Sequence, residues 1–543
     1  MKNISEKLKT AVDKLLESQI NIVTWTVGFC AMIGLRSFIE QITIPFPFPV
    51  EEAILEYLHN FFFFLLSFVA VWLILSLFTR IKPQKLATII FWGAWLSIFP
   101  PLIDMVKSQG SVFWSFYMLD NPHGLFLKFV TFFGNLPSGI VYFGTKIVFI
   151  AAILIVAAVV YINTKKVIRT IFSALCVYTV LFAMGSFPSW FAFAYSFFAK
   201  AKKISELQGP DIIQIVGVPY KLFGVEFANL KYSLAFNMNL VYFILLIGLL
   251  SLLFWKSDKI KFWAVVKNTR PPQLVYHAGL FSIGLGLGYL AYPGNYNLNV
   301  FSVLAALDLL LGVWLAWLAS VIINDIYDFE IDKISNPRRS LPENIFKIKE
   351  YAELGVVIFL LSLLGGLIVG LKFFVLLFLY QFLAWAYSAE PYRLKKFPGV
   401  ATFISSIASL LILFVGFFLF SGDKNLTGLS WRVILLISTA LTLSLPIKDF
   451  KDIEGDKKYG VWTIPVLLGE SGGRLVVSAG VFISFMLSVF LLNELRLFWW
   501  AILFGGASYL IITSRKIKPH LLFWWILAAV GAYGLILMKI VFL

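Results

Sequence analysis

The sequence predicts an all-α fold, a polytopic transmembrane helical bundle. Of its 543 residues, 60% are hydrophobic and only 14% are charged, and the mean hydropathy is +0.87. A single water-soluble core of this length could not hide so much apolar surface. Apolar runs of roughly 20 residues, the length that crosses the hydrocarbon layer, recur along the whole chain. We therefore expect an integral membrane protein, without sign of a cleaved signal peptide.

The first part of the chain, residues 1–255, predicts a module of about six spans. It opens with an amphipathic stretch in which Leu8, Val12 and Leu15 share a face, and we expect this stretch to lie on the membrane surface. The loops of this module carry no cluster of residues typical of catalysis. Its apolar runs lie near residues 20–38, 60–79, 86–106, 138–163, 168–198 and 235–255.

A basic segment, residues 256–272, is expected to link this module to a second one. Its sequence, KSDKIKFWAVVKNTRPP, ends in a Pro pair that cannot continue a helix. The second module, residues 273–543, predicts nine spans. They lie near residues 274–293, 298–323, 351–371, 373–389, 400–421, 431–446, 475–492, 497–513 and 520–541.

Basic residues predict how the second module is oriented, because Lys and Arg gather in cytoplasmic loops. One set of alternate loops holds most of them, whereas the other set holds only Lys372, Lys424, Arg432, Arg496 and Lys539. In the first module Arg80, Lys82 and Lys165 indicate a cytoplasmic N-terminus, although Lys200 and Lys202 argue for the opposite side. The same bias accounts for the formal net charge of +16, so we expect no nucleic-acid partner.

Two acidic triplets with identical spacing interrupt this apolar chain. They are Asp325, Asp328 and Asp332 in NDIYDFEID, and Asp449, Asp452 and Asp456 in DFKDIEGD. The spacing i, i+3, i+7 predicts three carboxylates on one stripe of a helix end, where they repel one another unless a cation or proton compensates. Both triplets follow spans that we expect to end on the cytoplasmic side, so they can share one site. Since Mg²⁺ typically binds one or two carboxylates, waters and phosphate oxygens, the pattern predicts a Mg²⁺ site for a phosphorylated substrate.

A diphosphate also needs positive and hydrogen-bonding side chains to fix its orientation. Asn324 adds a neutral amide directly before the first triplet. Any one Lys or Arg nearby is equally compatible with an ordinary solvated loop, and any one Tyr with an anchor at the membrane interface. The candidates are Arg338 and Arg339 after the first triplet, Lys448 before Asp449, and Tyr387, Tyr392, Arg393, Lys395 and Lys396 in the loop YSAEPYRLKK.

These motifs resemble those of a known family. NDIYDFEID is similar to the NDxxDxxxD motif of the UbiA superfamily of intramembrane prenyltransferases, and DFKDIEGD with the KKYGVWTIPVLLGE after it is similar to the family's second motif. YSAEPYRLKK resembles the family's loop between the fourth and fifth spans, which contains YxxxK. Tyr392 and Lys396 fit that spacing, and Tyr387 with Lys395 is a rival alignment. The resemblance covers about residues 270–543 and leaves the N-terminal module unrecognised.

The resemblance implies a bundle with a central cavity open to lipid, where Mg²⁺ holds an isoprenoid diphosphate at the cytoplasmic mouth. Asn324, Asp325, Asp328 and Asp332 match the first motif; Asp452 and Asp456 match the second, with Asp449 one turn earlier. On this basis we expect Asp325, Asp328, Asp452 and Asp456 to be catalytic and all six aspartates to bind metal. The implied function is Mg²⁺-dependent transfer of a polyprenyl group to a lipophilic acceptor: an aromatic quinone precursor, an ether-lipid glycerophosphate or a chlorophyll-type acceptor.

Two other functions are compatible with the same acids. Phosphoribosyl transfer to a polyprenyl phosphate would use metal and diphosphate in a similar way. An ion or solute transporter is the alternative from another class, because carboxylates within membranes often mark ion paths. The clustering of the acids at one expected mouth argues against transport.

Overall fold

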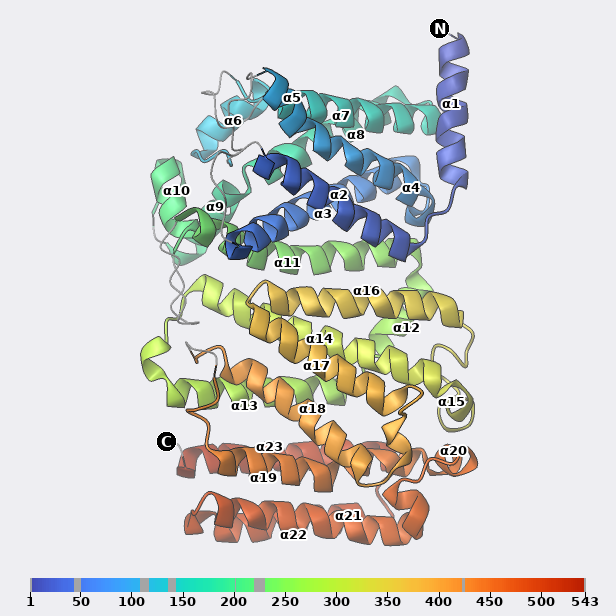
Figure 1. Ribbon diagram of the computed structural model, residues 1–543, viewed down its shortest axis with the longest axis vertical. Coiled ribbons are helices and arrows are strands. Elements are labelled where there is room, and N and C mark those ends of the chain that lie inside the picture. Colours follow the sequence, from blue (N-terminus) through green and yellow to red (C-terminus); the bar gives the residue numbers. More distant parts are fainter. Residues whose placement is uncertain are drawn as a thin grey trace. The chain divides into compact units, whose positions relative to one another are not determined.

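The computed structural model describes residues 2–42, 50–107, 117–134, 143–200, 202–218, 230–421 and 425–541. All regular elements of these residues are helices, as Figure 1 shows, and 15 helical segments are long and apolar enough to cross a membrane. Six of these segments lie between Ile22 and Ser257, and nine lie between Pro271 and Val541. The predicted all-α bundle of six and nine spans is confirmed. Lys424, used above to predict orientation, lies outside the described residues.

The chain folds as two compact units, which divide between Phe262 and Trp263. In the first unit α3 is the central helix, because it contacts α2, α4, α7, α8 and α11. The elements of this unit are α1 (Lys2–Glu17), α2 (Ile22–Ile42), α3 (Val50–Thr79), α4 (Pro83–Ala94), η1 (Trp95–Ile98), α5 (Phe99–Lys107), α6 (Pro122–Val130), α7 (Phe143–Thr164), α8 (Val167–Gly185), α9 (Phe187–Ala199), η2 (Ile204–Glu206), α10 (Gly209–Val216) and α11 (Leu230–Ser257).

Helix α12 (Lys259–Lys267) contains the division, and the second unit continues from it. Within this unit α14 packs against α16, α17 and α13, while α18 packs against α13, α17 and α19. The last helix, α23, returns to contact α13. The elements are α13 (Pro271–Ala291), η3 (Pro293–Asn295), α14 (Val300–Tyr327), α15 (Phe329–Ser335), α16 (Ile348–Leu367), α17 (Leu371–Ser388), η4 (Leu394–Lys396), α18 (Val400–Phe417), α19 (Trp431–Ser444), η5 (Leu445–Lys451), α20 (Ile453–Lys458), α21 (Ile464–Leu491), η6 (Leu495–Leu497), α22 (Phe498–Thr513) and α23 (Pro519–Val541).

Glycines let α13 and α18 approach each other closely. A Cβ atom built on Gly284 would lie 2.0 Å from the carbonyl oxygen of Leu413, and one built on Gly416 would lie 2.1 Å from that of Phe281. No larger residue fits these positions without moving a backbone, which is how small residues bring membrane helices together. This crossing holds the start of α13, and the chain just before it, beside the ends of the motif helices.

Each acidic triplet lies at a bend and not on one continuous helix. Helix α14 ends at Tyr327 and α15 begins at Phe329, with Asp328 between them at φ −99° and ψ 11°. Asp452 occupies the same kind of junction, at φ −109° and ψ 6°, between η5 and α20. The prediction that each triplet lies on one continuous helix end is therefore wrong, because a junction interrupts the helix at the middle aspartate of each triplet.

Candidate active site

Both triplets contribute to one cavity of about 200 Å³ in the second unit. Charged side chains are concentrated at one end of its lining, and aromatic and small residues from α13, α14, α17 and α18 form the rest. The acids in the lining are Asp328, Asp332, Asp449, Asp452 and Asp456, and the bases are Arg270, Arg339, Lys395, Lys448 and Lys451. The structure thus brings together two segments that lie more than a hundred residues apart in the sequence.

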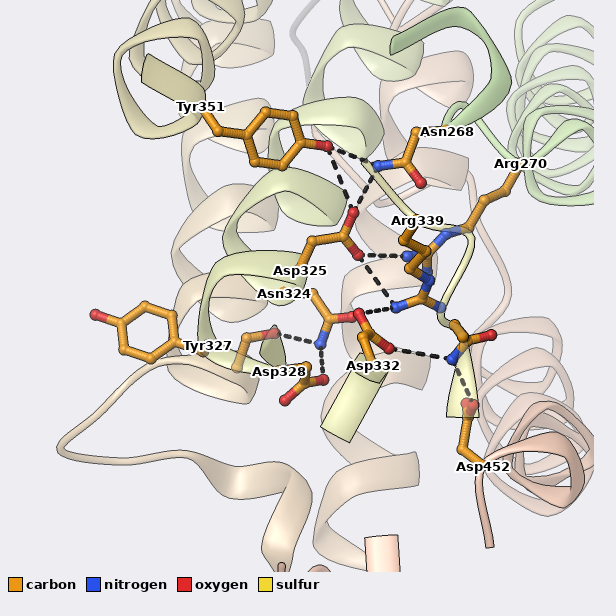
Figure 2. Close-up of polar contacts among 12 residues, drawn as sticks. Asn268, Arg270, Asn324, Asp325, Tyr327, Asp328, Asp332, Arg339, Tyr351 and Asp452 are labelled. Carbon is orange, nitrogen blue, oxygen red and sulfur yellow. Dashed lines mark hydrogen bonds and ion pairs between the residues drawn. The ribbon is translucent and has the colours of Figure 1, made fainter. Parts of the chain in front are cut away.

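Asp325 is the one aspartate of the two triplets that is not part of the lining of this cavity. Its Oδ1 atom lies 2.7 Å from Nη2 of Arg270 and 3.2 Å from Nη1 of Arg339. Its Oδ2 atom accepts hydrogen bonds from Asn268 Nδ2 at 2.5 Å and from the Tyr351 hydroxyl at 3.4 Å. Figure 2 shows all four partners on one side of the carboxylate, which is only 2% exposed. The chemistry available to Asp325 here is to hold two arginines in place.

Asp328 points to the other side of the helix end, into the cavity (Figure 2). Its Oδ2 accepts from Asn324 Nδ2 at 2.7 Å, and its Oδ1 forms an ion pair with the buried ammonium of Lys395. Arg393 Nη2 lies 3.5 Å from the same Oδ1. Because Lys395 follows α17 while Asp328 ends α14, this ion pair ties the loop between α17 and α18 to the first motif.

Asp332 and Asp452 join the two motifs through one amide. Asn336 Nδ2 donates to Asp332 Oδ1 at 3.1 Å and to Asp452 Oδ1 at 3.0 Å. The other oxygen of Asp332 forms an ion pair with Arg339, which also contacts Asp325. Ion pairs and hydrogen bonds therefore connect Asp325, through Arg339, Asp332 and Asn336, to Asp452 of the second motif.

The remaining predicted residues divide into two groups. Tyr387 and Lys448 both line the cavity, with the ammonium of Lys448 at 4.9 Å from the centre of the Tyr387 ring. Tyr392 is 54% exposed and packs edge-on against Trp385, and Lys396 pairs with Glu390 at 3.3 Å. Neither of these two, nor the exposed Arg338, is part of the lining. Of the rival loop alignments, Tyr387 with Lys395 is the pair that the structure places in the cavity.

The deeper wall is aromatic and hydrogen-bonded. His277 approaches the carbonyl oxygen of Gln273 with Nδ1 at 2.6 Å, so that nitrogen donates and leaves Nε2 to accept from the Tyr380 hydroxyl at 3.0 Å. The Tyr276 hydroxyl donates to Ser409 Oγ at 2.7 Å. Trp317 lies against the His277 ring, with 5.0 Å between centroids. This wall can bind an apolar chain. The side chains of His277, Tyr276 and Tyr380 are hydrogen-bonded, whereas the buried Oε1 of Gln273 has no partner among the described residues.

The donor set fits Mg²⁺ bound partly by phosphate. Among the described residues no group of three His, Cys, Asp or Glu side chains could enclose a metal ion by itself. Burial, together with the neighbouring carboxylates Asp325 and Asp328, raises the pKa of Asp332 to about 6. Burial and the charges of Asp452 and Asp449 raise the pKa of Asp456 to about 8. Crowded carboxylates with open coordination positions suit a cation that keeps waters and phosphate oxygens as ligands.

Sequence reasoning missed Asn268, Arg270, Asn336 and Tyr351 as site residues. Arg270 stands in the basic segment expected to be a linker, at φ +55°, and its guanidinium reaches the end of α14. Tyr351 reaches the same carboxylate from α16. The Asn-Thr-Arg-Pro-Pro sequence was the only local signal available, because a Pro pair begins a helix and places the residues before it at that helix end.

Residues 279–521 match the model of the UbiA prenyltransferase family. This part of the chain is similar to that family. The resemblance of its motifs is thus confirmed, and the match does not include the first unit. The match begins within α13, a few residues before Gly284, and ends within α23.

Relatives of this domain carry the names of enzymes of lipid biosynthesis. The chain is 31% identical over 198 residues to digeranylgeranylglyceryl phosphate synthase of Methanocaldococcus jannaschii, covering 35% of this chain and 63% of that protein. It is 28% identical over 202 residues to homogentisate phytyltransferase of Synechocystis, covering 33% and 62%. The chain thus spans less than two thirds of the length of these relatives. A solved structure of a UbiA homologue from Archaeoglobus fulgidus, bound to DMAPP and Mg²⁺, gives a TM-score of 0.39 at 20% identity, covering 51% of this chain and 99% of that one.

Proposed function

We propose that the second unit is a Mg²⁺-dependent integral membrane prenyltransferase, which moves a polyprenyl group from its diphosphate to a lipophilic acceptor. The observation that carries the proposal is the junction of two aspartate motifs and a set of basic residues at one end of an otherwise aromatic cavity. A prenyl diphosphate matches this arrangement, because its charge is at one end and the rest of the molecule is a long apolar chain. The match to the UbiA prenyltransferase family and the relative named as a phytyltransferase support this activity, and the relative named as a synthase supports a glycerophosphate-type acceptor.

In this proposal five aspartates, Asp328, Asp332, Asp449, Asp452 and Asp456, hold the metal. When bound, Mg²⁺ supplies positive charge to the oxygens of the departing diphosphate. Arg339, Lys395 and Lys448 bind those oxygens directly, and a preorganised set of donors is most valuable where negative charge grows during the reaction. Lys395 and Arg339 now pair with Asp328 and Asp332, so the same basic groups would be available to diphosphate oxygens if those aspartates held the metal.

Asp325 has a different proposed role from the other motif aspartates. Because it is not part of the cavity lining and its two oxygens are engaged by Arg270, Arg339, Asn268 and Tyr351, we assign it to positioning those arginines and not to metal binding or catalysis. Asn324 orients Asp328 through its 2.7 Å hydrogen bond. Arg338, Tyr392 and Lys396 are assigned no part in the site.

The aromatic wall protects the reaction from water. An allylic cation, or a transition state resembling one, is stabilised by aromatic faces and destroyed by water. Trp317, Tyr276 and Tyr380 provide such faces along the cavity. The apolar positions between them leave room for the hydrocarbon chain and for an acceptor that enters from the bilayer.

We also propose the orientation and domain roles predicted from the sequence. The charged mouth of the cavity faces the cytoplasm, because the loops that carry it also hold Arg338, Lys333 and Lys457, as expected of cytoplasmic loops. The segment 273–543 is the catalytic domain, and 1–255 is a separate membrane module. Asn268 and Arg270, from the segment 256–272, complete the catalytic domain.

Product analysis tests the function. Purified protein is incubated with Mg²⁺, a panel of prenyl diphosphates, and glycerophosphate-type, aromatic and chlorophyll-type acceptors, and the products are identified by mass spectrometry. The proposal expects equimolar diphosphate and prenylated acceptor. In parallel assays without any prenyl transfer, phosphoribosyl transfer from an added phosphoribosyl diphosphate to a polyprenyl phosphate, or solute flux in liposomes, would support one of the two alternative functions.

A further inference from the structure

The first unit contains a second cavity that follows α3 along its length. The residues of α3 that line it, Glu56, Asn60, Phe64, Ser67, Val71 and Leu75 among them, recur at intervals of three or four. They therefore form one stripe of the helix. From Glu56 to Leu75 this stripe is about 28 Å long at 1.5 Å per residue, close to the thickness of a hydrocarbon layer.

The stripe changes character from one end to the other. Glu56, His59 and Asn60 make one end polar, whereas Phe68, Val71 and Leu75 make the other end apolar. Helices α4 and α7 complete the apolar part with Ile89, Ile90 and Val156. A cavity with this gradient matches a molecule that has a small polar head and one long hydrocarbon chain.

The polar end is a network of hydrogen-bonding groups. His59 Nδ1 lies 3.0 Å from Asn239 Oδ1, so this nitrogen donates and Nε2 can accept from the Tyr117 hydroxyl at 2.7 Å. The same hydroxyl lies 2.7 Å from that of Tyr242. One more polar atom completes the set: the Oγ of Ser37, in the lining and 8% exposed, has no hydrogen-bond partner among the described residues. A buried hydroxyl without a partner is costly unless a ligand supplies one.

The charges at this end disfavour an anionic head. Arg36 is the single Lys or Arg among the described lining residues, and both of its terminal nitrogens contact Glu40, at 2.6 and 2.8 Å. Its Nε donates to the carbonyl oxygen of Ser97 at 3.0 Å. With Glu40 and Glu56 the lining has one more carboxylate than guanidinium groups. Among the described lining residues a phosphate would find only Arg36, which Glu40 already pairs, while a hydroxyl could donate to the carboxylate oxygens.

We propose that the first unit is a lipid-binding unit whose cavity holds a long-chain alcohol, with the uncharged hydroxyl head at Ser37 and Tyr117 and the single hydrocarbon chain along α3. This binding does not depend on the transferase activity proposed for the second unit. The site lies entirely in residues of the first unit, so it can be detected whether or not the second unit is active.

Photolabelling of the full-length protein tests this site. The probe is a long-chain alcohol with a diazirine in its chain, and labelled peptides are mapped by mass spectrometry. We expect labelling within 53–107 and 143–185, competed by the unlabelled alcohol and at least about tenfold less well by its monophosphate ester, because a buried unpaired charge costs more than 1.4 kcal/mol. Competition by the phosphate that equals or exceeds that of the alcohol, or no labelling in these segments, would overturn the proposal.

A matched pair of variants on α3 tests where the hydrocarbon chain of the alcohol lies. Ser67→Phe fills the lining, whereas Leu77→Phe adds a ring at an exposed position outside it. We expect Ser67→Phe to reduce labelling about tenfold and Leu77→Phe to stay within about twofold. Tyr117→Phe, which removes one hydroxyl, should abolish the preference for the alcohol over a hydrocarbon without the hydroxyl. Equal labelling of both α3 variants in monodisperse protein, or an unchanged preference in Tyr117→Phe, would contradict the assignment.

Discussion

Asp332 and Asp452, which belong to different motifs, accept hydrogen bonds from one and the same amide nitrogen, Asn336 Nδ2. This bridge fixes the distance between the two carboxylate groups before any substrate is bound. Asn336 is neutral: a cation at this position would compete with the proposed metal, and an acid would add to the repulsion between the carboxylates. The two motifs therefore form one site through a residue that belongs to neither.

Replacing Asn336 with Ala should weaken Mg²⁺ binding without removing a metal ligand. Loss of such a supporting hydrogen bond typically costs about 10- to 100-fold in metal affinity. We expect the Mg²⁺ concentration for half-maximal activity to rise by that amount, while activity at saturating Mg²⁺ falls less. Activity that is lost equally at all Mg²⁺ concentrations would contradict the bridging role.

Asp325 should matter for stability more than the other motif aspartates do. Removing it by Asp325→Ala leaves the guanidinium group of Arg270 without its carboxylate partner in a mostly buried pocket, and leaves Arg339 paired with Asp332 alone, which costs about 3 kcal/mol. A double-mutant cycle with Arg270→Ala, measured by thermal unfolding, should show coupling between the two residues. An Asp325→Ala protein with unchanged stability, additive effects in the cycle and abolished Mg²⁺ binding would instead make Asp325 a metal ligand.

Two adjacent lysines offer a matched comparison for the diphosphate. Lys395 is 5% exposed and pairs with Asp328 in the cavity, whereas Lys396 pairs with Glu390 outside it. Lys395→Ala should raise the KM for the prenyl diphosphate at least about tenfold, since a charged hydrogen bond contributes about 1.5 to 3 kcal/mol. Lys396→Ala should leave KM within about twofold. The opposite ranking would restore the alignment of Tyr392 with Lys396.

Glycine at the crossing of α13 and α18 should be required for stability. Gly416→Ala would bring a methyl group to about 2.1 Å from the carbonyl oxygen of Phe281, so we expect a loss of about 1 to 3 kcal/mol and a lower Tm. Gly279→Ala on α13 is the control, because its Cβ would meet nothing within 4 Å. If both variants unfold at the same temperature, close approach of the helices is not what stabilises this crossing.

The number of spans and the meeting of the two motifs could be predicted from the sequence, for a physical reason. Hydrophobic runs of this length indicate membrane spans, and the alternation of basic loops predicts on which side of the membrane each span ends. The breaks at Asp328 and Asp452 could not be predicted in this way. Residues spaced by three and seven lie on one helical stripe only while the helix continues. The spacing therefore placed Asp325 beside the other aspartates of its motif, whereas it is not part of the cavity lining.

The contacts of Arg270, Asn268 and Tyr351 with Asp325 depend on tertiary packing. They come from the segment before α13 and from α16, and no local pattern relates these segments to the end of α14. The sequence alone could not distinguish Tyr387 from Tyr392 for the same reason. Both stand in one short stretch of sequence with a lysine nearby. Tyr387, in the last turn of α17, lines the cavity, while Tyr392, beyond the end of α17, is exposed.

The most direct measurement of the central claim is the Mg²⁺ dependence of prenyl transfer in the wild type, in Asp452→Asn and in Glu454→Gln. Glu454 is an exposed acid two residues from Asp452 and outside the cavity lining, so its variant controls for general changes in charge. We expect transfer to stop in EDTA and return with Mg²⁺ in the wild type and in Glu454→Gln, and to fall at least about 100-fold in Asp452→Asn at any Mg²⁺ concentration. Transfer that persists in EDTA, or Asp452→Asn activity equal to that of Glu454→Gln, would contradict a site built from both aspartate motifs.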